Sequence, residues 1–252
     1  MYVFKDSASR KIGIFDELEY SMRSVEKNYI GEKRLFVVGD EPHIPHEGVI
    51  HIKGYPQYTA HTKKGHNVTI DQYFKQKAMV ESDQIGDEFV IMYDDIYLLK
   101  PTTREDLMIN WARMEIDSID DYIRNPIRTG TTSYLELWRN TYEGVKMIRE
   151  FKGLKTYDWE THTPRFFNKE KFAEVLAKGD FVDNPKLVPA VYDGLYAENT
   201  KIITADIQSD LWSHKPGMDF DLEFSRHYMN IYDDIIVPEF IKRMEERFGE
   251  CN

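Results

Sequence analysis

The chain of 252 residues has only one cysteine, Cys251, and no long hydrophobic run. A single cysteine excludes a disulfide bond within the chain and indicates a reducing compartment. The first residues lack a signal-peptide pattern, and no apolar stretch approaches the length needed to cross a bilayer. We therefore expect a cytoplasmic protein without a membrane span.

Basic charge is also scarce: 33 Lys and Arg against 44 Asp and Glu give a net charge of −11. This balance argues against nonspecific nucleic-acid binding as the default function. No internal repeat or low-complexity linker divides the chain, so we predict a single domain over residues 1–252. Aromatic residues are common, with 16 Tyr, 14 Phe and 4 Trp. They suit cores as well as sites that stack on sugars or bases. Nothing in the sequence indicates the oligomeric state.

Apolar runs alternate with amphipathic segments, which predicts an α/β fold with a mixed, mainly parallel sheet flanked by helices. Predicted strands cover residues 2–4, 34–40, 49–52, 89–95, 154–159 and 201–204. Predicted helices cover residues 18–29, 69–85, 107–114, 133–153, 168–179 and 237–248. The opening order of strand, helix, strand and strand is typical of a nucleotide-binding half-sheet.

The strongest chemical signal is an acidic pair at the end of a buried strand. Residues 89–93 are apolar or aromatic without a break, and Asp94 and Asp95 follow at once. In open α/β sheets, ligands bind at the carboxyl ends of the strands. Two adjacent carboxylates repel each other unless a cation lies between them, and Mg²⁺ or Mn²⁺ commonly bridges carboxylates to phosphates. This predicts a metal-assisted site for a phosphate-bearing ligand; the alternative is an exposed turn.

Two further groups at predicted strand ends or turns carry metal- or proton-binding side chains. Asp158, Glu160 and His162 form the first, and His214 the second. Strand ends at one edge of a sheet converge in space, so these groups are candidates to complete the metal site or to act as a general base. The alternatives are a lysine partner for Asp158, a structural turn residue at His162 and an ordinary exposed histidine at His214.

Four other residues are candidates for binding the phosphate-bearing ligand. Asp6 and Arg10 lie in the loop after the first predicted strand, and Arg23 lies on the first predicted helix. Lys64 belongs to a polar loop, residues 53–67, whose basic side chains are long enough to reach a pyrophosphate. The alternatives are a surface ion pair for Arg23 and a solvated loop for Lys64.

Three stretches together resemble nucleotide-sugar transferases with the GT-A fold. They are residues 17–28 (ELEYSMRSVEKN), 35–40 (LFVVGD) and 88–96 (EFVIMYDDI). The nearest pattern is that of Stealth-type capsular sugar-phosphate transferases and related bacterial and phage glycosyltransferases. Residues 161–165 (THTPR) are similar to a His-x-Pro segment in the same group. The resemblance covers about residues 17–168.

The resemblance implies a GT-A fold, a nucleoside-diphosphate sugar such as a UDP-sugar as donor, and Mn²⁺ or Mg²⁺ at the acidic pair. It makes Asp95 the main metal ligand, places Asp94 against the donor ribose or sugar, and places His162 on the acceptor or metal side. On this reading residues 1–100 bind the nucleotide sugar, and residues 101–252 form the acceptor half with a C-terminal helix.

Two departures from the pattern favour plain glycosyl transfer over sugar-phosphate transfer. Tyr93 stands where Stealth-type motifs have Asn, and the downstream Arg and Asp pattern of those enzymes has no match. The acceptor is left open between a glycan and a hydroxymethylated DNA base, which needs flipping into a pocket. Other readings are a sugar-phosphate transferase, a metal-dependent phosphatase or nucleotidyltransferase, and a non-catalytic nucleotide- or glycan-binding module.

Overall fold

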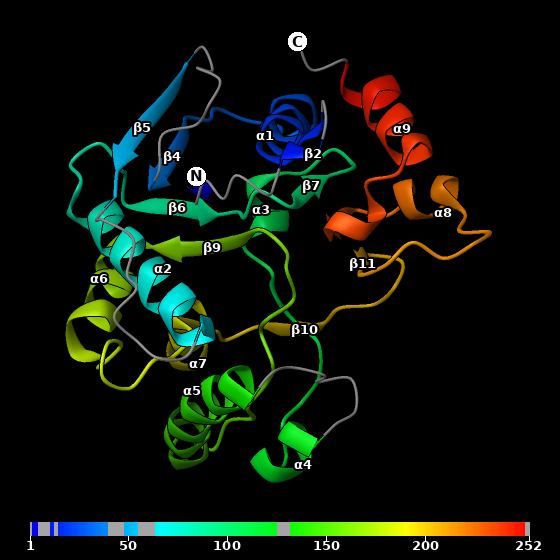
Figure 1. Ribbon diagram of the computed structural model, residues 1–252. Helices are drawn as coiled ribbons and strands as arrows, with labels where there is room; N and C mark the ends of the chain where they lie inside the picture. Colours follow the sequence, from blue (N-terminus) through cyan, green and yellow to red (C-terminus); the bar gives the residue numbers. More distant parts are fainter. Residues whose placement is uncertain are drawn as a thin grey trace.

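The computed structural model describes residues 2–4, 11–12, 15–39, 48–54, 64–124 and 132–249, and it is a mixed α/β structure (Figure 1). Three parallel strands form the N-terminal sheet in the order β1 (Tyr2–Phe4), β4 (Leu35–Gly39) and β5 (Val49–Lys53). A short antiparallel pair, β2 (Lys11–Ile12) and β3 (Phe15–Asp16), precedes the first helix. The predicted strands at residues 2–4, 34–40 and 49–52 are thus confirmed.

The remaining described strands pair in three further small sheets. β6 (Glu88–Ile91) runs antiparallel to β9 (Arg165–Asn168), and the two lie side by side in the centre of Figure 1. β7 (Ile96–Leu98) pairs antiparallel with β12 (Tyr228–Ile231), which is parallel to β11 (Gln208–Leu211). β8 (Asn110–Ala112) pairs parallel with β10 (Thr200–Ile202). Within the described residues, the strands therefore form several small sheets, of which the one made of β11, β12 and β7 is mixed, and not the single, mainly parallel sheet that was predicted.

Helices α1 (Glu17–Asn28) and α9 (Pro238–Phe248) pack against each other although they come from opposite ends of the chain. Asp16 caps α1 by accepting a hydrogen bond from the backbone N–H of Glu19 at 3.0 Å. Arg23 donates to the backbone carbonyl of Phe248 at 3.4 Å, and Lys27 donates to that of Arg247. The C-terminal helix predicted from its apolar stripe is confirmed, and its packing partner is α1.

The other described helices surround the strands. They are α2 (Lys64–Glu81), α3 (Arg104–Leu107), α4 (Ile119–Arg124), α5 (Thr132–Phe151), α6 (Lys169–Lys178), α7 (Val188–Tyr196), α8 (Phe220–Phe224) and the 3₁₀ turn Asp233–Ile235. Asn168 caps α6 through the N–H of Lys171 at 3.0 Å, which agrees with the predicted helix start. No described helix has the length and hydrophobicity needed to cross a membrane.

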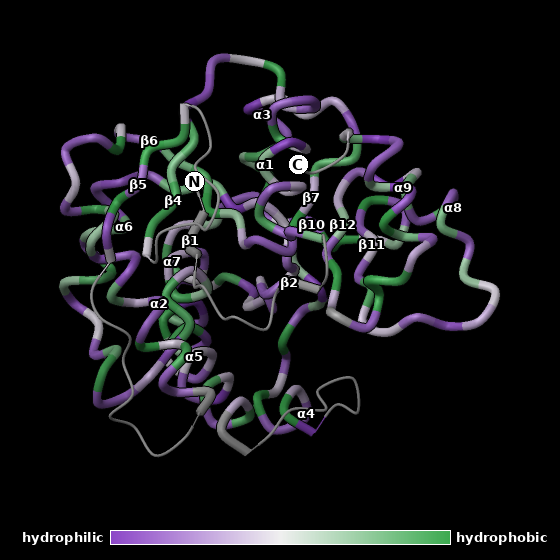
Figure 2. Tube along the Cα trace, turned by 45° about the horizontal axis from the view of Figure 1, so that its top comes forward, coloured by the Kyte–Doolittle hydropathy of each residue, from purple (hydrophilic) through white to green (hydrophobic). Residues whose placement is uncertain are grey.

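Apolar side chains gather where these elements meet. One core cluster lies between β4, β6, β9, α6 and α7, a second between β7, β12, α8 and α9, and a third between α1, β4 and β7. A fourth fills the space between α5, α4 and Trp159. Figure 2 shows hydrophobic colouring along strands such as β5 and β6 and hydrophilic colouring along the outer loops.

Four local predictions are wrong. Residues 107–114 are not a helix, because α3 ends at Leu107 and β8 follows. Residues 154–159 are not a strand and contribute only one isolated bridge, between Tyr157 and Glu115. α2 begins at Lys64 and α5 at Thr132, so positions 69 and 133, where these helices were predicted to begin, lie inside the helices. In each case tertiary packing outweighs the local sequence signal.

Candidate functional site

The acidic pair occupies a tight turn between β6 and β7. The backbone N–H of Ile96 donates to the carbonyl of Tyr93 at 3.2 Å and closes this turn around Asp94 and Asp95. Asp94 is buried, with 6% of its surface exposed, whereas Asp95 is partly exposed. The N–H of Ile231 donates to the carbonyl of Asp95 at 3.3 Å, which holds the end of β12 beside the turn.

A stacked aromatic pair lies next to Asp95. Trp212 follows β11 and Tyr232 follows β12, and because these strands are parallel, both residues emerge at the same edge. Their ring centroids are 4.2 Å apart with planes 22° from parallel, and 51% of Trp212 is exposed. Burial, with the negative charges of Asp95 and Asp210, raises the pKa of Tyr232. The pair forms an accessible aromatic face near the acidic turn.

His162 approaches the aromatic pair from the segment before β9. Its ring centroid lies 6.3 Å from that of Trp212, and its Nδ1 lies 3.4 Å from the amide nitrogen of Asn230. Gln208 donates to the backbone carbonyls of Thr161 and His162, the latter at 3.1 Å, and so fixes this segment on β11.

The backbone and the ring of His162 are both unusual. His162 is the one non-glycine residue in the described chain with positive φ, at 49°. Burial, followed by the positive charge of Arg113, lowers the pKa of its imidazole. His162 is therefore neutral at pH 7, as a metal ligand or general base must be.

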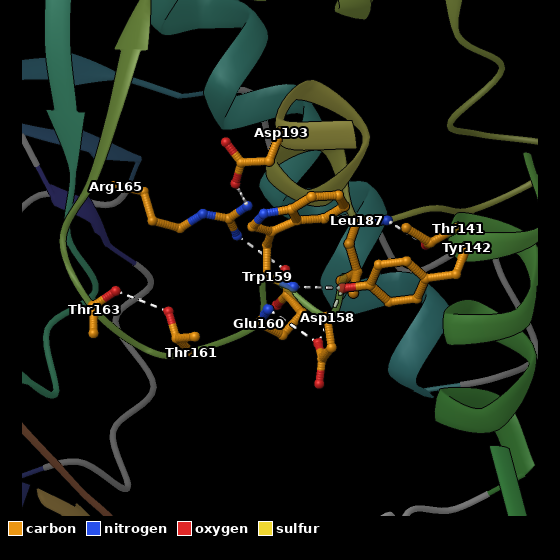
Figure 3. Close-up of polar contacts among 10 residues, drawn as sticks. All are labelled: Thr141, Tyr142, Asp158, Trp159, Glu160, Thr161, Thr163, Arg165, Leu187 and Asp193. Carbon is orange, nitrogen blue, oxygen red and sulfur yellow. Dashed lines mark hydrogen bonds and ion pairs between the residues drawn. The ribbon is translucent and has the colours of Figure 1, made fainter. Parts of the chain in front are cut away.

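An ion-pair group centres on Arg165 at the start of β9 (Figure 3). Arg165 pairs with Glu160 at 2.9 Å and also with Asp193 of α7, and all three side chains are at least four-fifths buried. Burial alone lowers the pKa of Arg165, but Asp193 and Glu160 outweigh it and raise the pKa, so the guanidinium stays charged. Burial and the charge of Glu160 raise the pKa of Tyr93, which places this group next to the start of the acidic turn.

Asp158 faces α5 and not the acidic turn. Its Oδ1 accepts hydrogen bonds from the hydroxyl of Tyr142 at 3.0 Å and from the N–H of Glu160 at 3.1 Å. Figure 3 shows the Asp158 carboxyl beside Tyr142 while Glu160 turns towards Arg165. Asp158, predicted as a catalytic residue, thus holds the segment that carries Glu160.

The remaining predicted residues lie elsewhere. Arg23 pairs with Glu19 at 2.5 Å and faces α9. His214 is exposed, with its ring 6.1 Å from that of Phe220 on α8. Asp6 and Arg10 fall outside the described residues, and for Lys64 the structure describes only its place as the first residue of α2.

The described residues contain no group of three or more His, Cys, Asp or Glu side chains close enough to form a metal cage. Four polar residues near the site were not predicted from the sequence, namely Arg113, Gln208, Asp210 and Asn230, and neither was a role for Trp212. Gln208 and Asp210 lie on the short polar strand β11, which no apolar run marks, whereas Asn230 is a polar residue within the buried strand β12. The one available signal for Arg165 was its place in the THTPR segment.

Comparison with models of known protein families gave no match for this chain, and comparison with curated proteins gave none either.

Proposed function

We propose that this protein is a metal-dependent glycosyltransferase that moves a sugar from a nucleoside-diphosphate sugar to a hydroxyl acceptor. The proposal rests on the resemblance in residues 17–168 and on one structural observation. Asp95, the stacked Trp212 and Tyr232, and His162 come from four segments of the chain and lie next to one another. An acidic turn suits a cation bound to a diphosphate, and an aromatic face suits a sugar ring.

The donor set fits one particular kind of cation site. Mg²⁺ often binds to one or two carboxylates, with waters and substrate phosphates completing its shell, so a protein cage of three or more ligands is not required. Asp95, with Asp94 behind it, would supply the carboxylates. The cation, when bound, would neutralise the diphosphate as it leaves. His214, predicted as a metal ligand, is not needed in this arrangement.

The chain's own side chains would position the reactants. His162 in its neutral form accepts a proton at a ring nitrogen and is a candidate to take it from the acceptor hydroxyl. The charged Arg165 holds Glu160 in place beside Tyr93. The sugar ring would lie on the face of Trp212 or Tyr232.

Thermal unfolding with a panel of nucleotide sugars, with and without Mn²⁺, tests this proposal. A donor at 100 times its dissociation constant stabilises the folded state by about 2.7 kcal/mol. For a domain of this size that free energy raises the melting temperature by roughly 5–10 °C. We expect this Mn²⁺-dependent shift in the wild type, and we expect it to be lost in Asp95→Asn.

The matched control is Asp83→Asn, which changes an exposed carboxylate in the turn after α2 and should keep the full shift. Hydrolysis of the same UDP-sugars without acceptor provides a second readout. If neither Asp95→Asn nor EDTA changes donor binding or hydrolysis, the assignment of the donor site is wrong.

A further inference from the structure

A cavity of about 430 Å³, lined by polar and apolar side chains, lies alongside β11. This volume is within the roughly 300–1,000 Å³ typical of small-molecule sites. Its lining comes from the end of β8, the segment between β10 and β11, β11 itself and the end of α8. The residues that matter to its chemistry are Arg113, Gln208, Ser209, Asp210, Glu223 and Arg226.

The cavity shares a wall with the candidate active site. Arg113 pairs with Asp210 at 3.2 Å, and both residues line the cavity. The charges of both also act on His162 and on Tyr232. Gln208, another lining residue, donates to the backbone carbonyl of His162. A ligand in the cavity would therefore lie one layer of side chains away from His162.

Two buried polar atoms of the lining have no hydrogen-bond partner in the described part of the chain. One is a donor, Nε of Arg226, and the other is an acceptor, Oδ1 of Asp210. The neighbouring carboxylate of Glu223 is already engaged, because it accepts a hydrogen bond from Ser209. Buried polar groups are normally paired, so an unpaired donor and an unpaired acceptor in one lining point to a missing ligand.

We propose that this cavity is an acceptor subsite that binds a neutral, hydroxyl-rich sugar unit of the acceptor, next to the unit whose hydroxyl reacts at His162. A sugar hydroxyl both donates and accepts, so it matches Asp210 and Arg226 together. A phosphate or carboxylate only accepts, and Asp210 and Glu223 would repel it. The two arginines and the two carboxylates of the lining cancel in charge, which also favours an uncharged ligand. This inference rests on the proposed glycosyl transfer and names the class of its acceptor.

Saturation-transfer NMR with a panel of methyl hexosides and common disaccharides tests the subsite directly. We expect at least one sugar to bind to the wild type at millimolar concentration. Arg226→Met removes the donor but keeps the apolar stem, and Asp210→Asn removes the charge but keeps the shape. Each should weaken binding about tenfold or more, because each removes a charge-assisted hydrogen bond.

The control is Arg139→Met, which removes an exposed arginine of α5 outside the cavity and should leave sugar binding unchanged. Melting temperatures of all variants establish that they fold. Absence of binding by every sugar, or binding that survives both cavity variants, overturns the inference. Binding of inorganic phosphate that is lost in Arg226→Met also overturns the inference.

The two proposals fail in different ways. If sugar binding depends on Arg226 and Asp210 while nucleotide sugars show no dependence on Asp95, the cavity is a sugar site and the transferase assignment is wrong. If donor binding depends on Asp95 but no sugar binds to the cavity, or sugar binding survives both cavity variants, only the acceptor assignment is wrong.

Discussion

Trp212 and Tyr232 stack at 4.2 Å because the parallel strands β11 and β12 deliver them to the same edge, where the N–H of Tyr232 donates to the carbonyl of Leu211 at 3.0 Å. Both rings keep a substantial exposed surface, 51% for Trp212 and 36% for Tyr232. A stacked pair contributes only about 0.5–1.5 kcal/mol beyond its buried area, so exposing so much aromatic surface suggests a binding role.

Replacing Trp212 with alanine should therefore affect ligand binding as well as folding. We expect the free energy of unfolding to fall by roughly 2–4 kcal/mol, measured by urea denaturation, because the buried part of the side chain is lost together with the stacked pair. Binding of the nucleotide sugar or the acceptor sugar should weaken by roughly tenfold, as measured by titration. Trp212→Phe should restore most of the affinity. Phe151→Ala, which removes a ring that is 94% exposed at the end of α5, serves as the control and should change neither quantity.

Arg165 should be among the residues on which stability depends most. Arg165→Met leaves the carboxylates of Glu160 and Asp193 buried without their cation. Loss of one partner from a buried ion pair costs about 3–5 kcal/mol, and urea denaturation should show a loss of that size. The exposed Arg139 also pairs with two carboxylates, yet Arg139→Met should cost about 1 kcal/mol or less.

A second substitution separates this explanation from lost packing. Adding Asp193→Asn to Arg165→Met removes one of the two unpaired charges and should recover part of the stability. Equal stability of the single and double variants would contradict the electrostatic account.

The lowered pKa of His162 predicts a pH dependence of stability. The unfolded chain takes up this proton near pH 6.5, whereas the folded protein takes it up only at lower pH, because of burial and Arg113. The unfolded state thus binds more protons below about pH 6.5, and the free energy of unfolding falls as the pH decreases through that range. His162→Asn should make this fall smaller, since asparagine does not titrate and tolerates positive φ.

His227 belongs in the same measurement. Burial lowers its pKa too, so it contributes a fall of the same sign in both proteins. The difference in slope between wild type and His162→Asn, from urea denaturation at a series of pH values, isolates His162. Identical slopes would show that the imidazole is not held neutral.

Substitution by alanine of two glycines on neighbouring helices should have opposite effects on the free energy of unfolding. A Cβ at Gly194 of α7 would lie 2.4 Å from a methyl carbon of Val145 on α5, so Gly194→Ala should destabilise by about 1–3 kcal/mol. A Cβ at Gly144 of α5 meets nothing within 4 Å. Gly144→Ala should stabilise by roughly 0.5–1 kcal/mol, because alanine favours the helix interior. Chemical denaturation of both variants measures the two changes in the free energy of unfolding. Changes of the same sign would contradict the packing of α5 against α7.

Local signals predicted the parts of the fold that depend on neighbouring residues. The apolar runs of β4 and β6 and the amphipathic patterns of α1 and α6 required no knowledge of the partner elements. β9 was missed because its short sequence RFFN pairs with β6, far away along the chain, and β11 was missed because its sequence QSDL is mainly polar. Pairing of that kind is decided by tertiary packing.

The residues of the candidate site also fall into those that the local sequence predicted and those that depend on the folded structure. The acidic pair was predicted from the strand that precedes it, and His162 from a short motif. The direction of Asp158 was not predictable, because it depends on Tyr142 of α5, and Gln208 and Asn230 act only through the partners that the fold brings to them.

The contact between α1 and α9 also bears on how the chain folds as it is made. Arg23 and Phe248 are 225 positions apart. At about 5–20 residues per second, the ribosome needs roughly 10–45 s to reach α9 after making α1. During that time the side of the first helix that α9 covers in the folded protein stays exposed, so this part of the fold can form only after the chain is almost complete.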